Sequence, residues 1–317
     1  MKEFFKNCLF VDEIDGWYVP SRFTRSQLEY YGREDSTWKR STATSSVILR
    51  FRTSATKLSL DYKIICKARE WALFDVLSDG VLYSSLSLTE DDGRVELSLP
   101  GDSEREISVY LPHLVNIQIK NITSDAPLIP VADRCLRYLA LGDSITQGMV
   151  ARHPFSAYPT LLSEAFDCEL INAGVGGIEF NSEELDYIGY EPDLITVALG
   201  TNDWGAEDAL GMKGRVCAYL DKLLSLYKCR RIYAITPTWR SDEERIRPNI
   251  ITFAEHRAAI AEAIAQYHEI KLIDGYTLVP HDLSLFGDPA NAPRQVHPNE
   301  EGFLHYANNL IKTIKSI

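Results

Sequence analysis

Apolar and polar residues alternate along the chain from residue 44 to residue 122. Segments rich in Val, Ile, Leu and Tyr are separated by turn-like sequences such as SDG, DDG and PGDSE. Alternation with period two is typical of strands that bury one face, and no helical pattern lies between these segments. We therefore predict an antiparallel β-sandwich or jelly roll, to which residues 1–43 add edge strands. The predicted strands lie in SSVILRFR, KLSLDYKI, ALFDVLSDG, VLYSSLSL, RVELSLP, EISVYLP and LVNIQIKNI.

The pattern changes after residues 124–134, where two prolines in SDAPLIPVADR mark a linker. Near-continuous apolar segments then alternate with helical ones, which predicts a five-stranded parallel sheet with helices on both faces. The expected domains are a β-sandwich over residues 1–130 and an α/β domain over residues 131–317. The strands are predicted in RYLALGDS, ELINAGV, DLITVALGTND, RIYAITPT and IKLIDGY. The helices are predicted in SAYPTLLSEAF, SEELDYIGY, GRVCAYLDKLLSLY, ITFAEHRAAIAEAIAQYH and NEEGFLHYANNLIKTIKSI.

Composition and charge narrow the possible functions. The chain has 317 residues and a net charge of −12 without a long basic run, which argues against a nucleic-acid or anionic-membrane surface. The N-terminal residues lack the apolar stretch of a signal peptide, and no run is long enough to span a membrane. Six scattered cysteines with no CxxC pair indicate reduced thiols, so we expect a cytoplasmic protein. His281 and Asp282 have no second ligand pair, and no metal is expected.

Candidate catalytic groups follow the strands of the predicted parallel sheet, where ligands bind in such folds. Ser144 follows the first strand, in LGDSITQG, where it can present its hydroxyl at a helix N-terminus or simply cap the helix. NAGVGG places Gly174, Gly176 and Gly177 after the second strand, and glycine lets a ligand approach the backbone closely. Asn202, in GTND, is a neutral donor suited to an oxyanion. Each feature also fits an ordinary turn, but their occurrence at successive strand ends favours an active site.

LGDSITQG, NAGVGG, LGTND and VHPNEEGF together resemble the four sequence blocks of the SGNH (GDSL-type) hydrolase superfamily, over residues 135–317. The resemblance implies a flavodoxin-like α/β/α fold with Ser144 as nucleophile, His297 as general base and no cofactor. It further implies an oxyanion hole formed by the backbone N–H groups of Ser144 and Gly177 and the side chain of Asn202. With a β-sandwich ahead of this domain, the chain is similar to two-domain carbohydrate esterases and acyltransferases of the superfamily.

The acid that usually orients the catalytic histidine is missing. Most members of the superfamily carry Asp three residues before the histidine, whereas this chain has Arg294. A backbone carbonyl can fix the tautomer of His297 and leave a Ser–His dyad, which is the alternative we favour. Otherwise, a carboxylate from elsewhere replaces the Asp, with Asp288, Asp282 and Glu300 nearest in sequence, or the site is inactive.

Other polar and aromatic residues near the strand ends also need an interpretation, and for Arg294 and two tryptophans two interpretations stay open. Arg294 is either a solvated residue or a partner for an acidic group on the substrate. Trp204 and Trp239, just past strand ends, either form a sugar-stacking wall or pack in the core and rim. Asp143 and Asp203 are expected to brace loops. The remaining histidines considered, namely His153 in a loop and His256, His268 and His305 on helices, are expected at polar or surface positions.

These features predict a serine esterase that hydrolyses short-chain acyl esters, acetyl first, of a carbohydrate or polyol. The expected partner is a small-molecule or oligosaccharide acyl ester. The alternatives are an acyltransferase with the same Ser/His site and an inactive carbohydrate-binding protein. The N-terminal domain is left with three possible roles: glycan binding, shaping the cleft, or self-association into a homo-oligomer.

Overall fold

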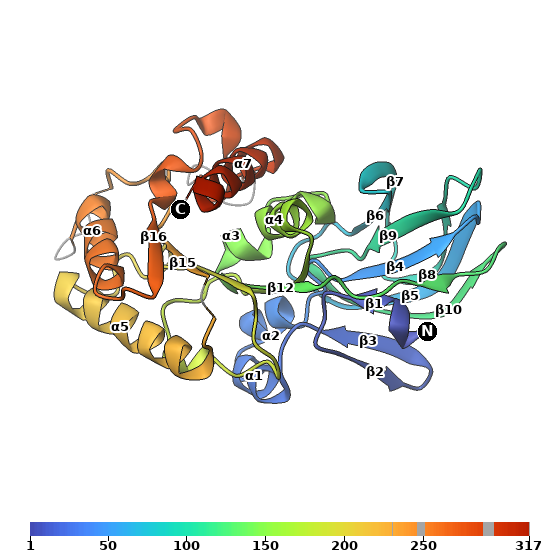
Figure 1. Cartoon of the computed structure of the whole chain (residues 1–317), viewed down its shortest axis with the longest axis horizontal. Coiled ribbons are helices and arrows are strands. Elements are labelled where there is room, and N and C mark those ends of the chain that lie inside the picture. Colours follow the sequence, from blue (N-terminus) through green and yellow to red (C-terminus); the bar gives the residue numbers. More distant parts are fainter. Residues whose placement is uncertain (230, 246–250, 288–294, 317) are drawn as a thin grey trace. The chain divides into compact units, whose positions relative to one another are not determined.

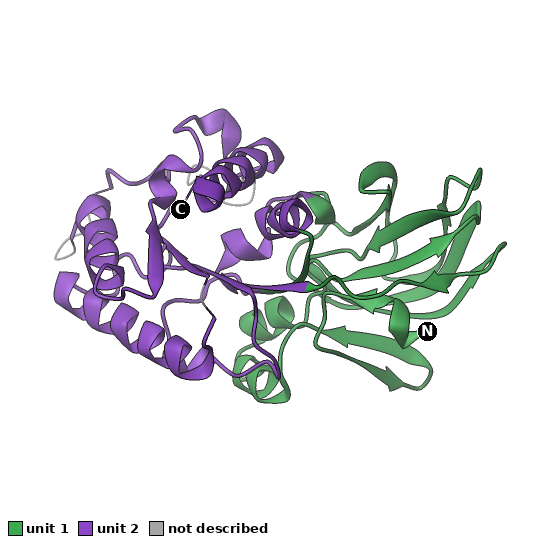
Figure 2. Ribbon diagram, viewed as in Figure 1, with its two compact units in different colours: residues 1–135, 152–155, 167–172 green, residues 136–151, 156–166, 173–317 purple. Residues whose placement is uncertain are grey.

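A computed structural model describes residues 1–229, 231–245, 251–287 and 295–316. The chain divides into two compact units, shown in Figure 2. Unit 1 comprises residues 1–135, 152–155 and 167–172, and unit 2 comprises residues 136–151, 156–166 and 173–317. Unit 1 therefore includes two short segments from the part of the sequence that follows the linker.

Unit 1 contains two antiparallel sheets (Figure 1). The strand order of the first is β1-β4-β9-β6-β7, with β11 also pairing with β4, and that of the second is β2-β3-β10-β5-β8. The strands of the first sheet are β1 (Phe5–Lys6), β4 (Ile48–Thr53), β6 (Leu73–Ser78), β7 (Val81–Ser87), β9 (Arg105–Tyr110) and β11 (Ile129–Pro130). Those of the second are β2 (Phe10–Ile14), β3 (Trp17–Ser21), β5 (Lys57–Lys67), β8 (Asp92–Ser98) and β10 (Val115–Ser124).

The two sheets share one hydrophobic core. Phe74 and Val109 from the first sheet belong to the same buried cluster as Leu60, Leu97 and Ile117 from the second. Along β5, buried residues alternate with more exposed ones, as expected for a strand that buries one face. The predicted sandwich is therefore confirmed, and its seven predicted strands are β4 to β10.

The expectation for residues 1–43 was incomplete. This segment contributes β1, β2 and β3, but it also forms two helices that were not predicted, α1 (Arg25–Tyr31) and α2 (Asp35–Ser41). Thr24 and Gln27 form a capping box at the start of α1, in which each side chain accepts a hydrogen bond from the other residue's backbone N–H. Both helices have only seven residues, too few to show a clear helical period in the sequence.

The sheet of the α/β domain has five strands in the order β13-β12-β14-β15-β16. The pairings β12–β14, β14–β15 and β15–β16 are parallel. Helices α5 and α6 lie on one face of this sheet and α4 and α7 on the other (Figure 1). The predicted flavodoxin-like fold is confirmed, with strands β12 (Leu136–Gly142), β13 (Cys168–Gly174), β14 (Leu194–Ala198), β15 (Ile232–Ile235) and β16 (Ile270–Ile273) and helices α4 (Tyr158–Phe166), α5 (Ala209–Leu226), α6 (Phe253–Ile264) and α7 (Glu300–Ser316).

One predicted helix is absent. SEELDYIGY forms only a single 3-10 turn, η3 (Ser182–Glu184). Beyond that turn, the Tyr227 hydroxyl donates to the carbonyl of Asp186 at 2.7 Å and accepts from the backbone N–H of Ile188 at 3.1 Å. A tertiary contact thus satisfies backbone groups that a helix would have paired internally.

Two further observations concern the cysteines and the helices. All six cysteines are free. Within the described ranges, no helix combines the length and apolar character needed to cross a membrane.

Candidate active site

The carboxyl ends of β12 and β14 lie next to each other because these strands are neighbours in the sheet. In a sheet of this strand order, the chain reverses its winding between these two strands, and ligands bind at this point. Ser144 follows β12, and the GTND sequence at residues 200–203 follows β14. The fold therefore brings two of the candidate sequence blocks to one edge.

Ser144 lies at a turn from strand to helix and faces His297. It is the first residue of the short helix α3 (Ser144–Gln147), whose N-cap is Asp143. The Asp143 carboxylate accepts a hydrogen bond from the backbone N–H of Ile145 at 2.9 Å, so the capping role considered for Ser144 belongs to its neighbour. Oγ of Ser144 and Nε2 of His297 are 2.8 Å apart, and the two residues are only 6% and 9% exposed. This distance permits direct proton transfer between them.

The segment that carries His297 is fixed by backbone hydrogen bonds to a preceding turn. The carbonyl of His297 accepts from the N–H of Gly287 at 3.1 Å, and the N–H of Asn299 donates to the carbonyl of Leu285 at 2.9 Å. Gly302, in the first turn of α7, lies so close to this turn that a Cβ would be 2.2 Å from the Leu285 carbonyl oxygen. These contacts fix the backbone on both sides of His297.

The glycine block lies against the nucleophile helix. A Cβ on Gly174 would be 2.3 Å from the backbone nitrogen of Gln147, which explains glycine at this strand end. The N–H of Gly176 donates to the Gln147 side chain at 2.8 Å. Gly177 has a φ of +87°, favourable only for glycine, and it is exposed between buried neighbours. The loop that carries the expected Gly177 donor is thus tied to the helix of Ser144.

Asn202 is fixed to the same glycine-block loop. Its side-chain amide donates to the carbonyl of Ile178 at 2.9 Å. The neighbouring Asp203 accepts from the N–H of Phe180 at 3.0 Å, so consecutive side chains join the two loops, and the expected bracing role of Asp203 is observed. An amide group has two N–H donors, and the contact with Ile178 occupies one of them. The oxyanion role expected for Asn202 would use the other.

The residues around Asn202 are held from the opposite side by donors that the sequence did not reveal. Nε2 of His256 lies 2.8 Å from the carbonyl oxygen of Gly200. Nη1 of Arg240 donates to the carbonyl of Thr201 at 3.1 Å. His256 is fully buried, so its expected surface position was wrong. It lies on the buried face of α6, together with Phe253 and Ile260.

Burial changes the acidity of two carboxyl groups near Ser144. Desolvation raises the pKa of Asp143 to about 7 and that of Asp203 to about 6. For Asp143, the hydrogen bond from Ile145 acts in the opposite direction but is the smaller effect. Both groups therefore bind protons at a higher pH than a solvated aspartate does.

The candidates for an orienting acid remain predictions. Asp288 and Arg294 lie outside the described residues. Asp282 is exposed, and its carboxylate accepts from the N–H of Ser284 at 2.9 Å, which lowers its pKa. Glu300 is the first residue of α7. Asp282 thus has a structural role in capping its own turn.

The two tryptophans past the strand ends differ in exposure. Trp204 is 3% exposed, its ring lies 5.1 Å from that of Phe253, and its Nε1 donates to the carbonyl of Ile251, as the packing alternative predicts. Trp239 is half-buried and stacks on the exposed His281 with ring centroids 5.6 Å apart. Of the two, Trp239 is the more exposed.

His153 belongs to unit 1, whereas Ser144 belongs to unit 2. Its Nδ1 lies 2.9 Å from a carboxylate oxygen of Asp75, which is fully buried in β6. The expectation of a polar loop residue is met, with an acidic partner that the sequence did not indicate.

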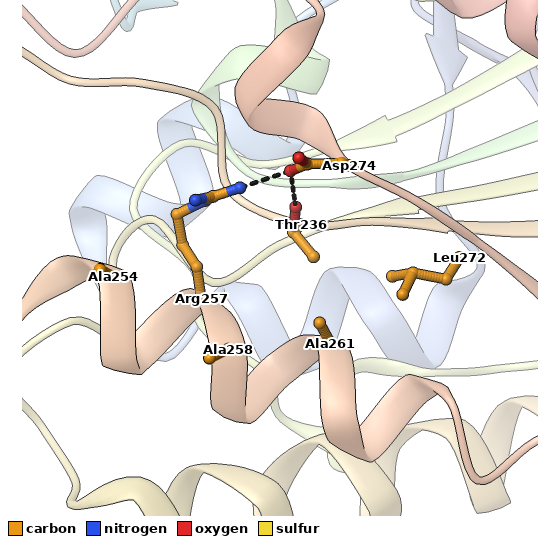
Figure 3. A pocket seen from close by; sticks show the side chains of 7 residues that line it. All are labelled: Thr236, Ala254, Arg257, Ala258, Ala261, Leu272 and Asp274. Carbon is orange, nitrogen blue, oxygen red and sulfur yellow. Dashed lines mark hydrogen bonds and ion pairs between the residues drawn. The ribbon is translucent and has the colours of Figure 1, made fainter.

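A cavity of about 320 Å³ lies between α6 and the edge strand β16 (Figure 3). Arg257 points from α6 toward Asp274, with which it forms an ion pair, and Thr236 donates to the same carboxylate. The lining consists of Thr236, Ala254, Arg257, Ala258, Ala261, Leu272 and Asp274, so this cavity is separate from the Ser144–His297 pair.

Solved structures with similar folds share this two-part architecture. A salicylyl-acyltransferase from a tetracycline biosynthetic pathway, SsfX3, is 18% identical with a TM-score of 0.81, covering 98% of this chain and 94% of that one. A family two carbohydrate esterase from Clostridium thermocellum in complex with cellohexaose is 14% identical with a TM-score of 0.66, covering 86% and 93%. An acetyl xylan esterase from the rumen bacterium Butyrivibrio proteoclasticus is 15% identical with a TM-score of 0.60, covering 86% and 90%.

A search of curated proteins gave no match. The model of the GDSL-like Lipase/Acylhydrolase family matches residues 140–303, which is more than half of the chain and includes Ser144, Gly177, Asn202 and His297. The chain therefore belongs to the GDSL-like lipase/acylhydrolase family and is an SGNH-type esterase or acyltransferase.

Proposed function

We propose that this protein is a serine esterase that removes short acyl groups, acetyl first, from a carbohydrate or another polyol. The observation that carries the proposal is the 2.8 Å contact between the Ser144 hydroxyl and Nε2 of His297. A serine within hydrogen-bond reach of an imidazole has a base for its proton when it attacks a carbonyl.

The reaction proceeds in two halves. In the first, His297 takes the hydroxyl proton as Oγ of Ser144 bonds to the ester carbonyl carbon, and then returns that proton to the departing alcohol. The backbone N–H groups of Ser144 and Gly177 and the amide of Asn202 stabilise the oxyanion. In the second, water loses a proton to His297, attacks the acyl-serine and releases the acid, which regenerates Ser144.

The proposed substrate class draws on the structural neighbours, which include a family two carbohydrate esterase and an acetyl xylan esterase. Their likeness is one of fold, so the substrate itself must be tested. Purified protein should release p-nitrophenol from p-nitrophenyl acetate, and S144A should abolish this activity. S163A, which removes a buried hydroxyl from α4, is the matched control and should retain it. Undiminished turnover by S144A would exclude the proposed nucleophile.

Acyl transfer is the second candidate, because the similarity to the salicylyl-acyltransferase covers nearly the whole of both chains. The acyl-serine would then react with an alcohol rather than water. Adding glycerol or xylose to the p-nitrophenyl acetate reaction distinguishes the two. An esterase releases acetate regardless of acceptor, whereas a transferase yields the acetylated acceptor as its main product.

We further propose that a backbone carbonyl orients His297 and that no carboxylate completes a triad. D282N, D288N and E300Q should then each retain kcat within about threefold of wild type. An orienting acid contributes about 10⁴-fold in kcat in serine proteases, so a loss of this size in one variant would identify that residue as the third member.

A further inference from the structure

We propose that Arg240 is a positioning residue that sets the oxyanion donor Asn202 by holding the carbonyl of Thr201. This inference rests on the proposed function, since it concerns the same site. Nη1 of Arg240 donates to the Thr201 carbonyl at 3.1 Å, one residue before Asn202. Arg240 is 7% exposed, so the contact is shielded from water.

The guanidinium of Arg240 is itself fixed in place. Nε and Nη2 donate to the two carboxylate oxygens of Asp242, the second at 3.1 Å. Such two-point pairing fixes the plane of the guanidinium and leaves Nη1 aimed at the Thr201 carbonyl. The cation also lies 5.0 Å from the ring centre of Trp204 and 5.7 Å from that of Phe253. Arg240 therefore has few orientations open to it.

The loop around Asn202 is tightly packed, and one of its buried carbonyls needs a donor from the protein. Gly200 has a φ of +107°, and a Cβ there would be 2.6 Å from the Ile260 side chain. Thr201 is 5% exposed, so its carbonyl requires a protein donor in place of water. On the other side, Asn202 donates to the carbonyl of Ile178. The amide is thus held between Arg240 and the glycine-block loop, and loss of either contact lets it move.

Arg257 provides a matched control. It also bonds a carboxylate, Asp274, donates from Nε to a backbone carbonyl, that of Pro237, at 3.0 Å, and lies 4.1 Å from an aromatic ring centre, that of Tyr276. Its contact with Asp274 is drawn in Figure 3. The two arginines thus make the same kinds of contact, but only Arg240 bonds the residue before Asn202.

The test compares R240M and R257M with p-nitrophenyl acetate, below the melting temperature of each variant. Removing an oxyanion donor costs about 10²–10³-fold in kcat, so displacing one should cost about 10- to 100-fold, with KM nearly unchanged. R257M should stay within about threefold of wild type, as expected for a structural arginine outside the site. R240K, which keeps a charged donor group on a single nitrogen, should recover part of the loss.

A double-mutant cycle separates positioning from general destabilisation. If Arg240 acts through Asn202, R240M should lower kcat by no more than about threefold in the N202A background. An equal loss in both backgrounds, or equal losses for R240M and R257M, would overturn the inference. If R240M does not fold, R240K is measured in the wild-type and N202A backgrounds instead. An equal loss of kcat in both backgrounds would then overturn the inference. Failure of the proposed function is distinct, because S144A would then remain active.

Discussion

Asp143 is buried directly before the nucleophile, and the resulting rise in its pKa to about 7 has a measurable consequence for stability. The unfolded state titrates near the usual value of 3.8, so between about pH 4 and pH 7 the folded state holds the extra proton. The free energy of unfolding therefore contains a favourable contribution from this protonated carboxyl group. That contribution is fully present below pH 4 and is lost as the pH rises through 7.

D143N removes this titration and keeps the acceptor for the Ile145 N–H. Relative to wild type, D143N should therefore gain stability between pH 4 and pH 8, by up to about 4 kcal/mol. Denaturant unfolding at the two pH values measures the difference. A stability difference that does not change with pH would contradict the assigned pKa.

Asn202 permits a direct prediction for catalysis. N202A should lower kcat about 10²–10³-fold with a smaller effect on KM, because the amide acts on the transition state. Steady-state kinetics with p-nitrophenyl acetate measures both constants. N181A, which changes an amide that caps the turn η3, is the matched control and should leave kcat within about threefold. If N202A mainly raised KM and left kcat nearly unchanged, Asn202 would instead contribute to binding of the substrate in its ground state.

At the residue level, the residues predicted for the candidate site are those that belong to recognisable sequence blocks. Ser144, Gly177, Asn202 and His297 each stand in such a block. Arg240 was not predicted, because its role depends on contacts with a loop that lies about 40 residues earlier in the chain. Residue type alone cannot indicate contacts of this kind.

At the level of elements, the close approach of β13 to α3 explains a glycine at position 174. G174A would place a Cβ 2.3 Å from the backbone of Gln147, so we expect a loss of about 1–3 kcal/mol and lower activity. Gly214 is the matched control: it lies within α5 with open space around it, so G214A should stabilise by about 0.5–1 kcal/mol. Thermal unfolding of both variants tests the contrast. A wild-type melting temperature for G174A would show that the two elements can separate.

The strands and long helices could be predicted because their periods are strong, as in β5 and α7. The short elements could not. Helix α1 depends on a capping box, and SEELDYIGY is held out of a helix by the Tyr227 hydroxyl. Local pattern therefore predicted the layers of both parts of the chain, whereas single side chains decided their irregular connections.

At the level of the whole molecule, unit 1 depends on segments that lie far apart in the sequence. Arg22 is fully buried and donates to the carbonyls of Ala43 and Arg40, both at 2.8 Å, and to the carbonyl of Asn172, 150 residues away. A domain boundary read from composition does not reveal that residues 168–172, although they form part of strand β13 of the parallel sheet, cluster with unit 1.

R22M should therefore destabilise the protein by about 2–4 kcal/mol, since it leaves several buried carbonyls without a donor. R25M, which removes a surface ion pair with Asp12, should cost about 1 kcal/mol or less. Denaturant unfolding monitored by circular dichroism compares the two. Similar small losses in both would show that the Arg22 contacts contribute little.

The central claim is that Ser144 is activated by His297. Intact-protein mass spectrometry after treatment with a fluorophosphonate tests it most directly. We predict a single adduct on Ser144, absent in S144A and formed at least about 100-fold more slowly in H297N, because general-base catalysis contributes about 10²–10⁴-fold. An adduct on another residue, or an unchanged labelling rate in H297N, would contradict the claim.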